Sequence, residues 1–435
     1  MYTYVRNLSE LANIGGYTLH IDDLLFIFVV IYCVAGAGRQ VNRSFGSLAL
    51  LALSAILLLN FVRGASEVGL KDAGVAFRNS STFVSVSIFI CFWFSRLDAQ
   101  WVLNKVYQFG WLIVVLAVIR TVFGWDALMA AAAKIDPFAE PRILDSGATF
   151  MLGTAAMIAL SDALWLNSRM TRWWRGISFL IFLAVVLATD QRTATFTTIG
   201  GCVVTVLLSR PHQRRLAILC GVAGIVILSF IFSAIFIASS GDVNSVLPKS
   251  INMMTEEDST YTWRIVQWEL YLNSYWDASS ISQLIGFPAG EIRSIALRAP
   301  PDDIEAKMLT AVPHNGYVNF LITAGFIGLC LFLVALVGSL FKSLYLLLRV
   351  QADKRFGLAV ALIIAIAIYS YAYPINESGI LLAIAIGIID TIYRELGEVS
   401  SVGRTELPVR TKRLVHRGHT HRNDGPEKRN APVRR

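Results

Sequence analysis

The chain has 435 residues, of which 55% are hydrophobic and only 16% are charged. Soluble domains carry about 25% charged residues, so this composition excludes an ordinary soluble protein and indicates a polytopic membrane domain. The 38 Lys and Arg residues against 30 Asp and Glu leave a formal net charge of +8, and the positions of these charges decide what the excess does.

Apolar stretches long enough to cross a bilayer recur along the chain. A membrane-spanning helix needs roughly 20 mostly apolar residues. We therefore predict an all-α, polytopic integral membrane bundle of about 11 transmembrane helices, within a range of about 10 to 12. The predicted spans are 24–38, 46–62, 80–95, 106–124, 147–166, 174–189, 193–209, 216–238, 316–340, 356–374 and 378–393.

The basic residues predict the orientation. Alternate connections, together with the C-terminal segment, hold 25 of the 38 Lys and Arg residues, and such connections face the cytoplasm. This distribution places the N-terminus outside and the C-terminus inside. Residues 1–393 then form the membrane domain, which includes a large extracytoplasmic loop at 239–313. Residues 394–435 form a basic cytoplasmic tail that we expect to be disordered and drawn to anionic membrane lipid, with no nucleic acid partner.

The large outer loop is rich in aromatic residues and resumes a helical pattern in WRIVQWELYLNSYW, from Trp263 to Trp276. This pattern predicts one or two amphipathic helices on or near the outer face of the membrane. Interfacial anchoring by Trp and Tyr is a second interpretation, and it is compatible with the first.

A small group of polar residues occurs at the predicted outer ends of helices, where an unpaired charge is costly. Arg192 begins a span, Arg264 lies in the aromatic part of the loop, and His314 begins another span. A neutral imidazole can accept a proton near pH 7, as a general base must. Each residue also has an ordinary structural interpretation: an ion pair with Asp190 or an interfacial cation for Arg192, a solvated face for Arg264 and a helix-terminus hydrogen bond for His314.

Four motifs together carry a resemblance: QRTA around Arg192, TWRIVQW around Arg264, LIGFPAG at 284–290, and PHNGYVNFLITAGFIG beginning at Pro313. In this order they resemble the O-antigen ligase and polymerase family, which transfers glycans carried on undecaprenyl diphosphate. The resemblance covers about residues 180–345. The chain departs from the family pattern at Thr323, where many relatives have an acidic residue.

The resemblance implies a glycosyltransferase of the bacterial inner (cytoplasmic) membrane whose active face is periplasmic, and it makes 1–393 a transferase domain. It implies that His314 is the base, that Arg192 and Arg264 bind the donor and that Asn315 is a further substrate-binding residue, with no metal and no cofactor. The accessory candidates are Arg63, Arg78, Asp190 and Glu377. Its implied partners are an undecaprenyl-diphosphate-linked glycan donor, a glycan or lipid A-core acceptor, and a chain-length regulator.

Three functions remain open on the sequence. A polymerase of exopolysaccharide or O-antigen would join one repeat unit to another, and we favour it. A ligase would move the finished glycan to lipid A-core. A transporter or flippase would place charges at mid-span, where Arg120 and Asp162 are the candidates, whereas the marked residues gather at the outer face.

Overall fold

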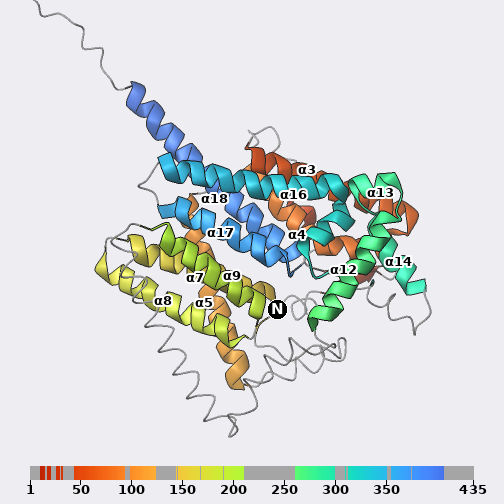
Figure 1. Ribbon diagram of the computed structural model, residues 1–435, viewed down its shortest axis with the longest axis horizontal. Helices are drawn as coiled ribbons and strands as arrows, with labels where there is room; N and C mark the ends of the chain where they lie inside the picture. The colour runs from red at the N-terminus through yellow and green to blue at the C-terminus, as the bar shows by residue number, and fades with distance from the viewer. Residues whose placement is uncertain are drawn as a thin grey trace, which may run out of the picture. The chain divides into compact units, whose positions relative to one another are not determined.

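The computed structural model shows a helical membrane protein with one small β-hairpin (Figure 1). Its described residues are 10–14, 17–20, 26–29, 31–32, 44–93, 98–123, 144, 146–166, 168–189, 191–209, 260–298, 309, 312–349, 354–373 and 375–405. In the hairpin, β1 (Glu10–Ile14) pairs antiparallel with β2 (Tyr17–His20), with Ile14 opposite Tyr17. The prediction of an all-α membrane bundle is confirmed, and the short hairpin was not predicted.

Among the described residues, nine of the eleven predicted spans coincide with helices. Most of 24–38 and all of 216–238 lie outside the described residues, so the predicted count of eleven stays a prediction. The nine helices are α3 (Phe45–Glu67), α4 (Leu70–Trp93), α5 (Ala99–Phe123), α7 (Ser146–Trp165), α8 (Arg169–Ala188), α9 (Arg192–Leu207), α16 (Gly316–Arg349), α17 (Lys354–Ser370) and α18 (Ile375–Thr405).

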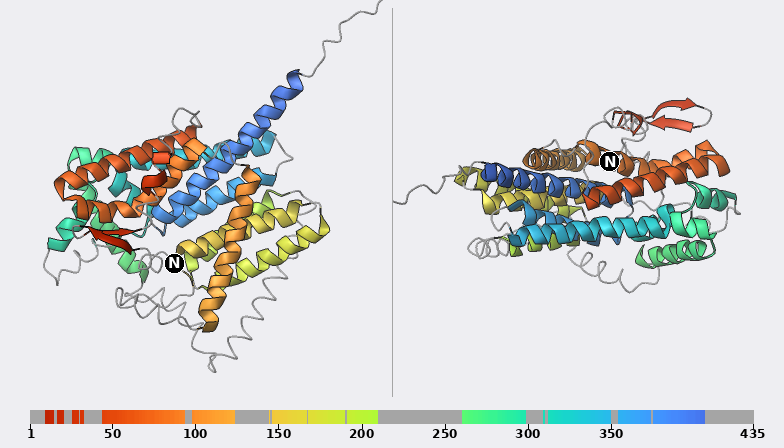
Figure 2. Two further views of the ribbon diagram at one scale, coloured as in Figure 1. Left: turned by 180° about the vertical axis from the view of Figure 1, so that it is seen from behind. Right: turned by 90° about the horizontal axis from the view of Figure 1, so that it is seen from above.

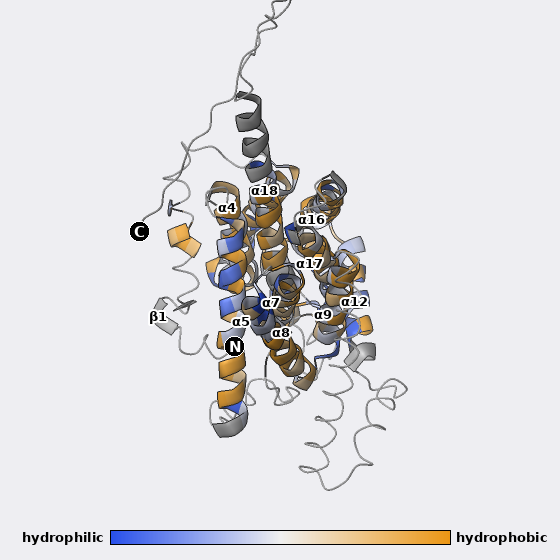
Figure 3. Cartoon of the chain, turned by 90° about the vertical axis from the view of Figure 1, so that its left-hand side faces the viewer, coloured by the Kyte–Doolittle hydropathy of each residue, from blue (hydrophilic) through white to orange (hydrophobic). Residues whose placement is uncertain are grey.

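Five of the described helices are long and apolar enough to cross a membrane: α3, α5, α7, α8 and α16. The count rises to six if α4, which is bent by 63° between Arg78 and Ser80, is one span. Figure 3 shows apolar residues along α7, α8, α16 and α17. The protein is therefore a multi-pass membrane protein.

The helices pack in two groups that α17 joins. In the first group, α3 packs against α4 and α16 (Figure 1). In the second, α7 packs against α5, α8 and α9, and α5 runs across α7 and α8 (Figure 2). α17 contacts α16 as well as α7 and α9, so it connects the elements that carry the predicted site residues.

Close packing around α7 depends on small residues. A Cβ atom on Gly153 would lie 2.0 Å from Thr198 Oγ1, and one on Gly201 would lie 2.1 Å from Met157 Sδ. The hydroxyl of Thr198 donates to the carbonyl of Ala194, four residues earlier, at 2.7 Å. Such contacts allow membrane helices to approach closely while their polar side chains stay satisfied.

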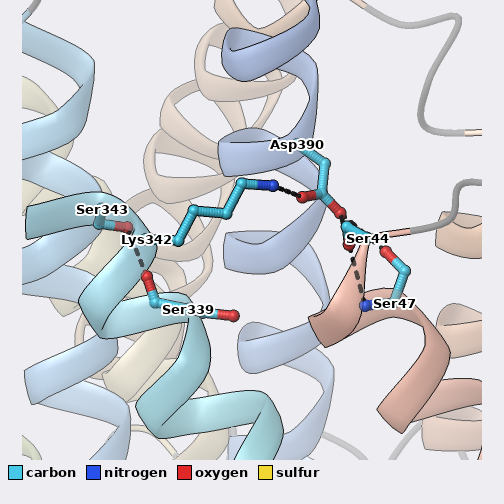
Figure 4. A network of polar contacts seen from close by, with 6 residues as sticks. All are labelled: Ser44, Ser47, Ser339, Lys342, Ser343 and Asp390. Carbon is cyan, nitrogen blue, oxygen red and sulfur yellow. Dashed lines mark hydrogen bonds and ion pairs between the residues drawn. The ribbon is translucent and has the colours of Figure 1, made fainter. Parts of the chain in front are cut away.

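Polar contacts join helix ends on the side predicted to be cytoplasmic. Lys342 of α16 donates to Asp390 of α18 at 2.6 Å, and the same carboxylate accepts from Ser47 of α3 at 2.8 Å and from Ser44 (Figure 4). In the second group, Asp162, a candidate mid-span charge, lies 3.4 Å from Arg175 at the ends of α7 and α8. A buried charge needs such a partner, so the ion pair gives Asp162 a structural role.

Three further helices come from the predicted outer loop, which confirms that the loop is partly helical. They are α12 (Thr260–Trp276), α13 (Ser280–Ile285) and α14 (Glu291–Arg298). α12 and α13 pack against α16, and α14 packs against α4 (Figure 1).

The chain divides by its internal contacts into Met1–Arg394 and Glu395–Arg435. α18 continues to Thr405, so the first part of the segment expected to be a disordered tail is helical. Residues 406–435 lie outside the described residues.

Candidate active site

The ends of α9, α12, α16 and α17 on the predicted outer side meet around one buried side chain, Tyr373. Its hydroxyl donates to Gln191 Oε1 at 2.8 Å, immediately before α9. The guanidinium of Arg264, on α12, lies 5.8 Å from the centre of its ring. Gly316, the first residue of α16, packs so closely that an added Cβ would lie 3.0 Å from the Tyr373 carbonyl oxygen. Elements that carry all three main predicted residues therefore meet at Tyr373.

Arg192 is the first residue of α9, and its side chain is exposed. The preceding residue, Gln191, is only 2% exposed and occupies the N-cap position. The N-terminus of a helix carries a partial positive charge and several N–H groups without intrahelical partners. An arginine at this position adds a full positive charge, and the combination is suited to binding a phosphate group.

Arg264 is half-buried on α12, above a column of stacked rings. Tyr373 stacks on Tyr369 at 4.5 Å, and Tyr369 stacks on Phe150 of α7 at 3.9 Å. An arginine near the face of an aromatic ring gains a cation–π attraction while its N–H groups remain available to a ligand. The stacked rings therefore hold the positive charge of Arg264 next to Tyr373.

His314 and Asn315 form the entry to α16. The His314 backbone N–H donates to Gln267 Oε1 of α12 at 3.4 Å. The Asn315 Oδ1 accepts from the backbone N–H groups of Tyr317 at 2.9 Å and Val318 at 3.1 Å. These bonds make Asn315 the cap of α16, so its side-chain oxygen holds the helix, and the amide nitrogen is the group left to contact a substrate.

Arg63, an accessory candidate, holds the glycine motif in place. Its Nη1 donates to Asn60 Oδ1 at 2.8 Å and to the Gly286 carbonyl at 2.9 Å. Asn60 Nδ2 in turn donates to the carbonyls of Ile285 and Thr323. One face of the Arg63 guanidinium is thus committed to joining α3, the LIGFPAG segment and α16.

Of the other accessory candidates, only the side chain of Arg78 is among the described residues. Arg78 is buried, and its carbonyl accepts from the Ser81 hydroxyl at 2.9 Å. Asp190 lies outside the described residues, as does the side chain of Glu377, whose backbone is in the first turn of α18. Within the described ranges, no three His, Cys, Asp or Glu side chains gather as ligands for a metal ion.

One carboxyl that the sequence did not single out, Glu291 at the start of α14, has a perturbed pKa. Burial raises the pKa of this carboxyl above its ordinary value, the charge of Glu67 raises it further, and Arg63 lowers it. A raised carboxyl pKa means that the neutral form is favoured. Glu291 therefore keeps its proton to a higher pH than an exposed glutamate does.

The motif that begins at Pro313, PHNGYVNFLITAGFIG, contains a break in α16 at Gly325. Gly325 has φ 69° and ψ −171°, a conformation that is essentially restricted to glycine. The break frees backbone carbonyls, and two of them find partners outside the helix. The Ile322 carbonyl accepts from the Phe287 N–H at 2.9 Å, and the Thr323 carbonyl accepts from Asn60 at 2.8 Å. The LIGFPAG segment is therefore a packing element that fills the break.

We expect Gly325→Ala to reduce the amount of folded protein strongly. A Cβ at this position would lie 2.4 Å from the Leu284 carbonyl oxygen, and the strained backbone alone costs about 1–3 kcal/mol. The measurement is the thermal midpoint of the purified protein in detergent. Gly176→Ala is the matched control, since nothing lies within 4 Å of its added Cβ. Equal midpoints for the two variants would contradict this explanation of the break.

Tyr373 was not predicted from the sequence, although it is the residue at which α9, α12 and α16 meet. The available signal was the tyrosine-rich run YSYAYP at the end of a span, which also reads as interfacial anchoring. Tyr373 is 6% exposed, so it is part of the interior and not an interfacial anchor.

Tyr373→Phe is expected to keep the stacked column and to lose the hydrogen bond to Gln191. A buried polar group left without its partner costs about 1–3 kcal/mol, or roughly 5- to 150-fold if the whole cost falls on the reaction. Because the ring and its stacking remain, any fall in the thermal midpoint should be limited to that of one lost hydrogen bond, while turnover also falls. Tyr371→Phe, at a half-exposed neighbour, is the control. A loss of stability with unchanged specific activity would show that the contact only supports the fold.

The described residues form a multi-pass helical membrane protein in which the elements that carry Arg192, Arg264 and His314 meet at Tyr373. Residues 177–333 match the O-antigen ligase family. The matched region spans α9, α12, α13 and α14 with most of α8 and the first half of α16. The match supports a relation to the O-antigen ligase/polymerase family, a glycosyltransferase-type class of enzyme. No curated protein matched the sequence.

Proposed function

We propose that the protein is the polymerase of a bacterial polysaccharide, acting at the periplasmic face of the inner membrane. It transfers an oligosaccharide repeat unit from undecaprenyl diphosphate to a sugar hydroxyl of another unit. The observation that carries the proposal is the meeting of the elements bearing Arg192, Arg264 and His314 at Tyr373. The match of this same region to the O-antigen ligase family supports the class of reaction.

The arginines bind the diphosphate of the donor. A guanidinium keeps its charge at all physiological pH values and makes two parallel hydrogen bonds to a phosphate. Arg192 supplies this fork at the N-terminus of α9, where the helix adds its own N–H groups. Arg264 reaches the same region from above the Tyr373 ring. Both charges stabilise the negative charge that develops on the diphosphate as it leaves.

His314 removes the proton from the attacking hydroxyl. The oxygen of the acceptor sugar forms a bond to the anomeric carbon of the donor while the bond from that carbon to the diphosphate oxygen breaks. The diphosphate leaves with the electron pair, and the proton stays on the imidazole. Attack opposite the leaving group inverts the anomeric centre. The Gln267 side chain fixes the backbone of His314 and so the position of the base.

A deletion strain tests the polymerase against the ligase. Loss of a polymerase leaves single repeat units on undecaprenyl diphosphate, whereas loss of a ligase leaves long chains on that lipid. We expect single units, measured by mass spectrometry of the extracted lipid-linked glycans. Long lipid-linked chains would identify the protein as a ligase, and an unchanged glycan pattern would contradict both functions.

A further inference from the structure

A cavity of about 130 Å³ lies next to the proposed base. Neither Arg192 nor Arg264, the two residues that we call the arginine cluster, lines it. Its lining comes from α3, α4, α12, α14, the LIGFPAG segment and the stretch that leads into and through the first turns of α16. Pro313 lines it, immediately before His314, while Gly316 packs against Tyr373. The chain therefore passes from the cavity to the arginine cluster within four residues, and His314 lies on this passage.

Along one face of α12, the residues follow the same order from the arginine cluster, past His314, to the cavity. Arg264, Gln267 and Tyr271 are spaced three and four residues apart, which puts them in one row on a helix. Arg264 lies above Tyr373, Gln267 binds the His314 backbone, and Tyr271 lines the cavity. Seven residues of helix span about 10 Å. The charge at one end, the base in the middle and the cavity at the other end are thus separated by lengths comparable to a sugar residue.

The lining of the cavity suits a sugar ring. The aromatic residues Phe77, Tyr271 and Phe287 supply surfaces for the C–H faces of a pyranose. Asn319, which is 2% exposed, lines the cavity, and its Oδ1 accepts from the Thr323 hydroxyl at 3.4 Å. The Nε of Arg293, another lining residue, is buried with no hydrogen-bond partner in the described structure. Small-molecule pockets combine an apolar lining with a few such polar groups.

The size of the cavity sets how much of a glycan it accepts. A cavity of about 150 Å³ in another protein holds one benzene ring. At about 130 Å³, this cavity is of similar size, so it can enclose no more than part of one sugar residue and cannot enclose an oligosaccharide. A reaction with a hydroxyl nucleophile needs one sugar held firmly beside the base, and the rest of the acceptor can extend outward.

We propose that this cavity is the subsite for the accepting sugar residue, with Asn319 and Arg293 as its polar contacts. The proposal rests on the proposed glycosyl transfer and names where the second substrate binds. Donor and acceptor then approach His314 from opposite sides, the donor from the arginine cluster and the acceptor from the cavity. This arrangement is the one that in-line displacement of the diphosphate requires.

The test separates the two substrates in membranes that contain the full chain. The donor is the radiolabelled lipid-linked repeat unit, and the acceptor probe is the repeat-unit oligosaccharide released from that lipid by mild acid, which can accept but cannot donate. Two variants address the cavity. Ala76→Phe fills it, and Arg293→Gln removes a charged contact from α14 while keeping a polar side chain.

We expect each variant to raise the KM for the acceptor probe by about tenfold or more, equivalent to ~1.4 kcal/mol, with the KM for the donor unchanged. The matched controls are Val115→Phe, on the half-exposed face of α5, and Lys71→Gln, which removes another charge at an exposed position of α4. Neither control residue lines the cavity, so both controls should behave as wild type.

Two results would overturn the proposal. A higher KM for the donor alone would mean that the cavity holds the isoprenoid chain of the donor lipid, and unchanged KM values for both substrates would mean that it binds neither. Failure of the proposed function looks different, because the wild type would then not extend the probe. If the wild type instead transfers the unit to lipid A-core, the same variants are measured with that acceptor, and the same two results apply.

Discussion

Replacing His314 with alanine is expected to abolish polymer formation while the protein remains inserted in the membrane at normal abundance. A general base contributes about 10²- to 10⁴-fold to a reaction rate, and the alanine side chain cannot accept the proton of the attacking hydroxyl. The contacts that hold this segment are made by the His314 backbone and by the Asn315 cap, and both survive the substitution. The measurement is the rate of repeat-unit transfer in membranes, normalised to the amount of protein.

His416→Ala, in the basic C-terminal segment, removes a histidine far along the chain and should leave the rate unchanged. Binding of the lipid-linked donor to His314→Ala should also stay close to wild type, because the base acts on the acceptor hydroxyl. Full transfer activity of His314→Ala would remove His314 from the mechanism.

Arg192→Lys is expected to lower kcat/KM for the donor by about 10- to 150-fold, although the formal charge is kept. Lysine offers a single point charge where arginine offers two parallel donors, and a hydrogen bond to a charged group is worth about 1.5–3 kcal/mol. The matched control is Arg169→Lys, since Arg169 is also exposed and is also the first residue of a helix, α8. It lies at the end of the bundle predicted to face the cytoplasm.

Inhibition by inorganic diphosphate gives a second test of Arg192. If the residue binds a diphosphate, Arg192→Ala should raise the donor KM more than Arg192→Lys does, and added inorganic diphosphate should inhibit wild type more than either variant. Equal inhibition of all three proteins by diphosphate would contradict the assigned contact.

The helical membrane fold was predictable because its signal is local. Apolar stretches such as 46–62 and 316–340 predict helices wherever a bilayer leaves the backbone no other way to satisfy its hydrogen bonds. The bend in α4 and the break at Gly325 were not predictable in the same way. Gly325 and Gly328 read equally well as a small-residue face for helix contact, and only the approach of Leu284 and Asn60 distinguishes the two interpretations.

The candidate site, too, was only partly predictable from the sequence. Arg192, Arg264 and His314 were recognisable because charged or titratable groups at helix ends need a reason to be there. Asn315 was predicted to contact substrate, which stays a prediction, and the structure adds that its side-chain oxygen caps α16. Tyr373 and Asn60 act through partners more than 180 residues away in sequence, Gln191 and Ile285 respectively, and no local pattern reports such pairs.

The break in α16 also affects how the enzyme responds to its lipid surroundings. The 34 residues of this helix would extend about 50 Å if continuous, well beyond a hydrocarbon core of about 30 Å. The first turns of α16, which precede the break, are bound to α3 and to LIGFPAG through Asn60 and Phe287. The remainder of the helix can tilt to match a thinner or thicker bilayer without carrying His314 with it. Transfer activity is therefore expected to be nearly constant across phosphatidylcholine bilayers of different acyl length.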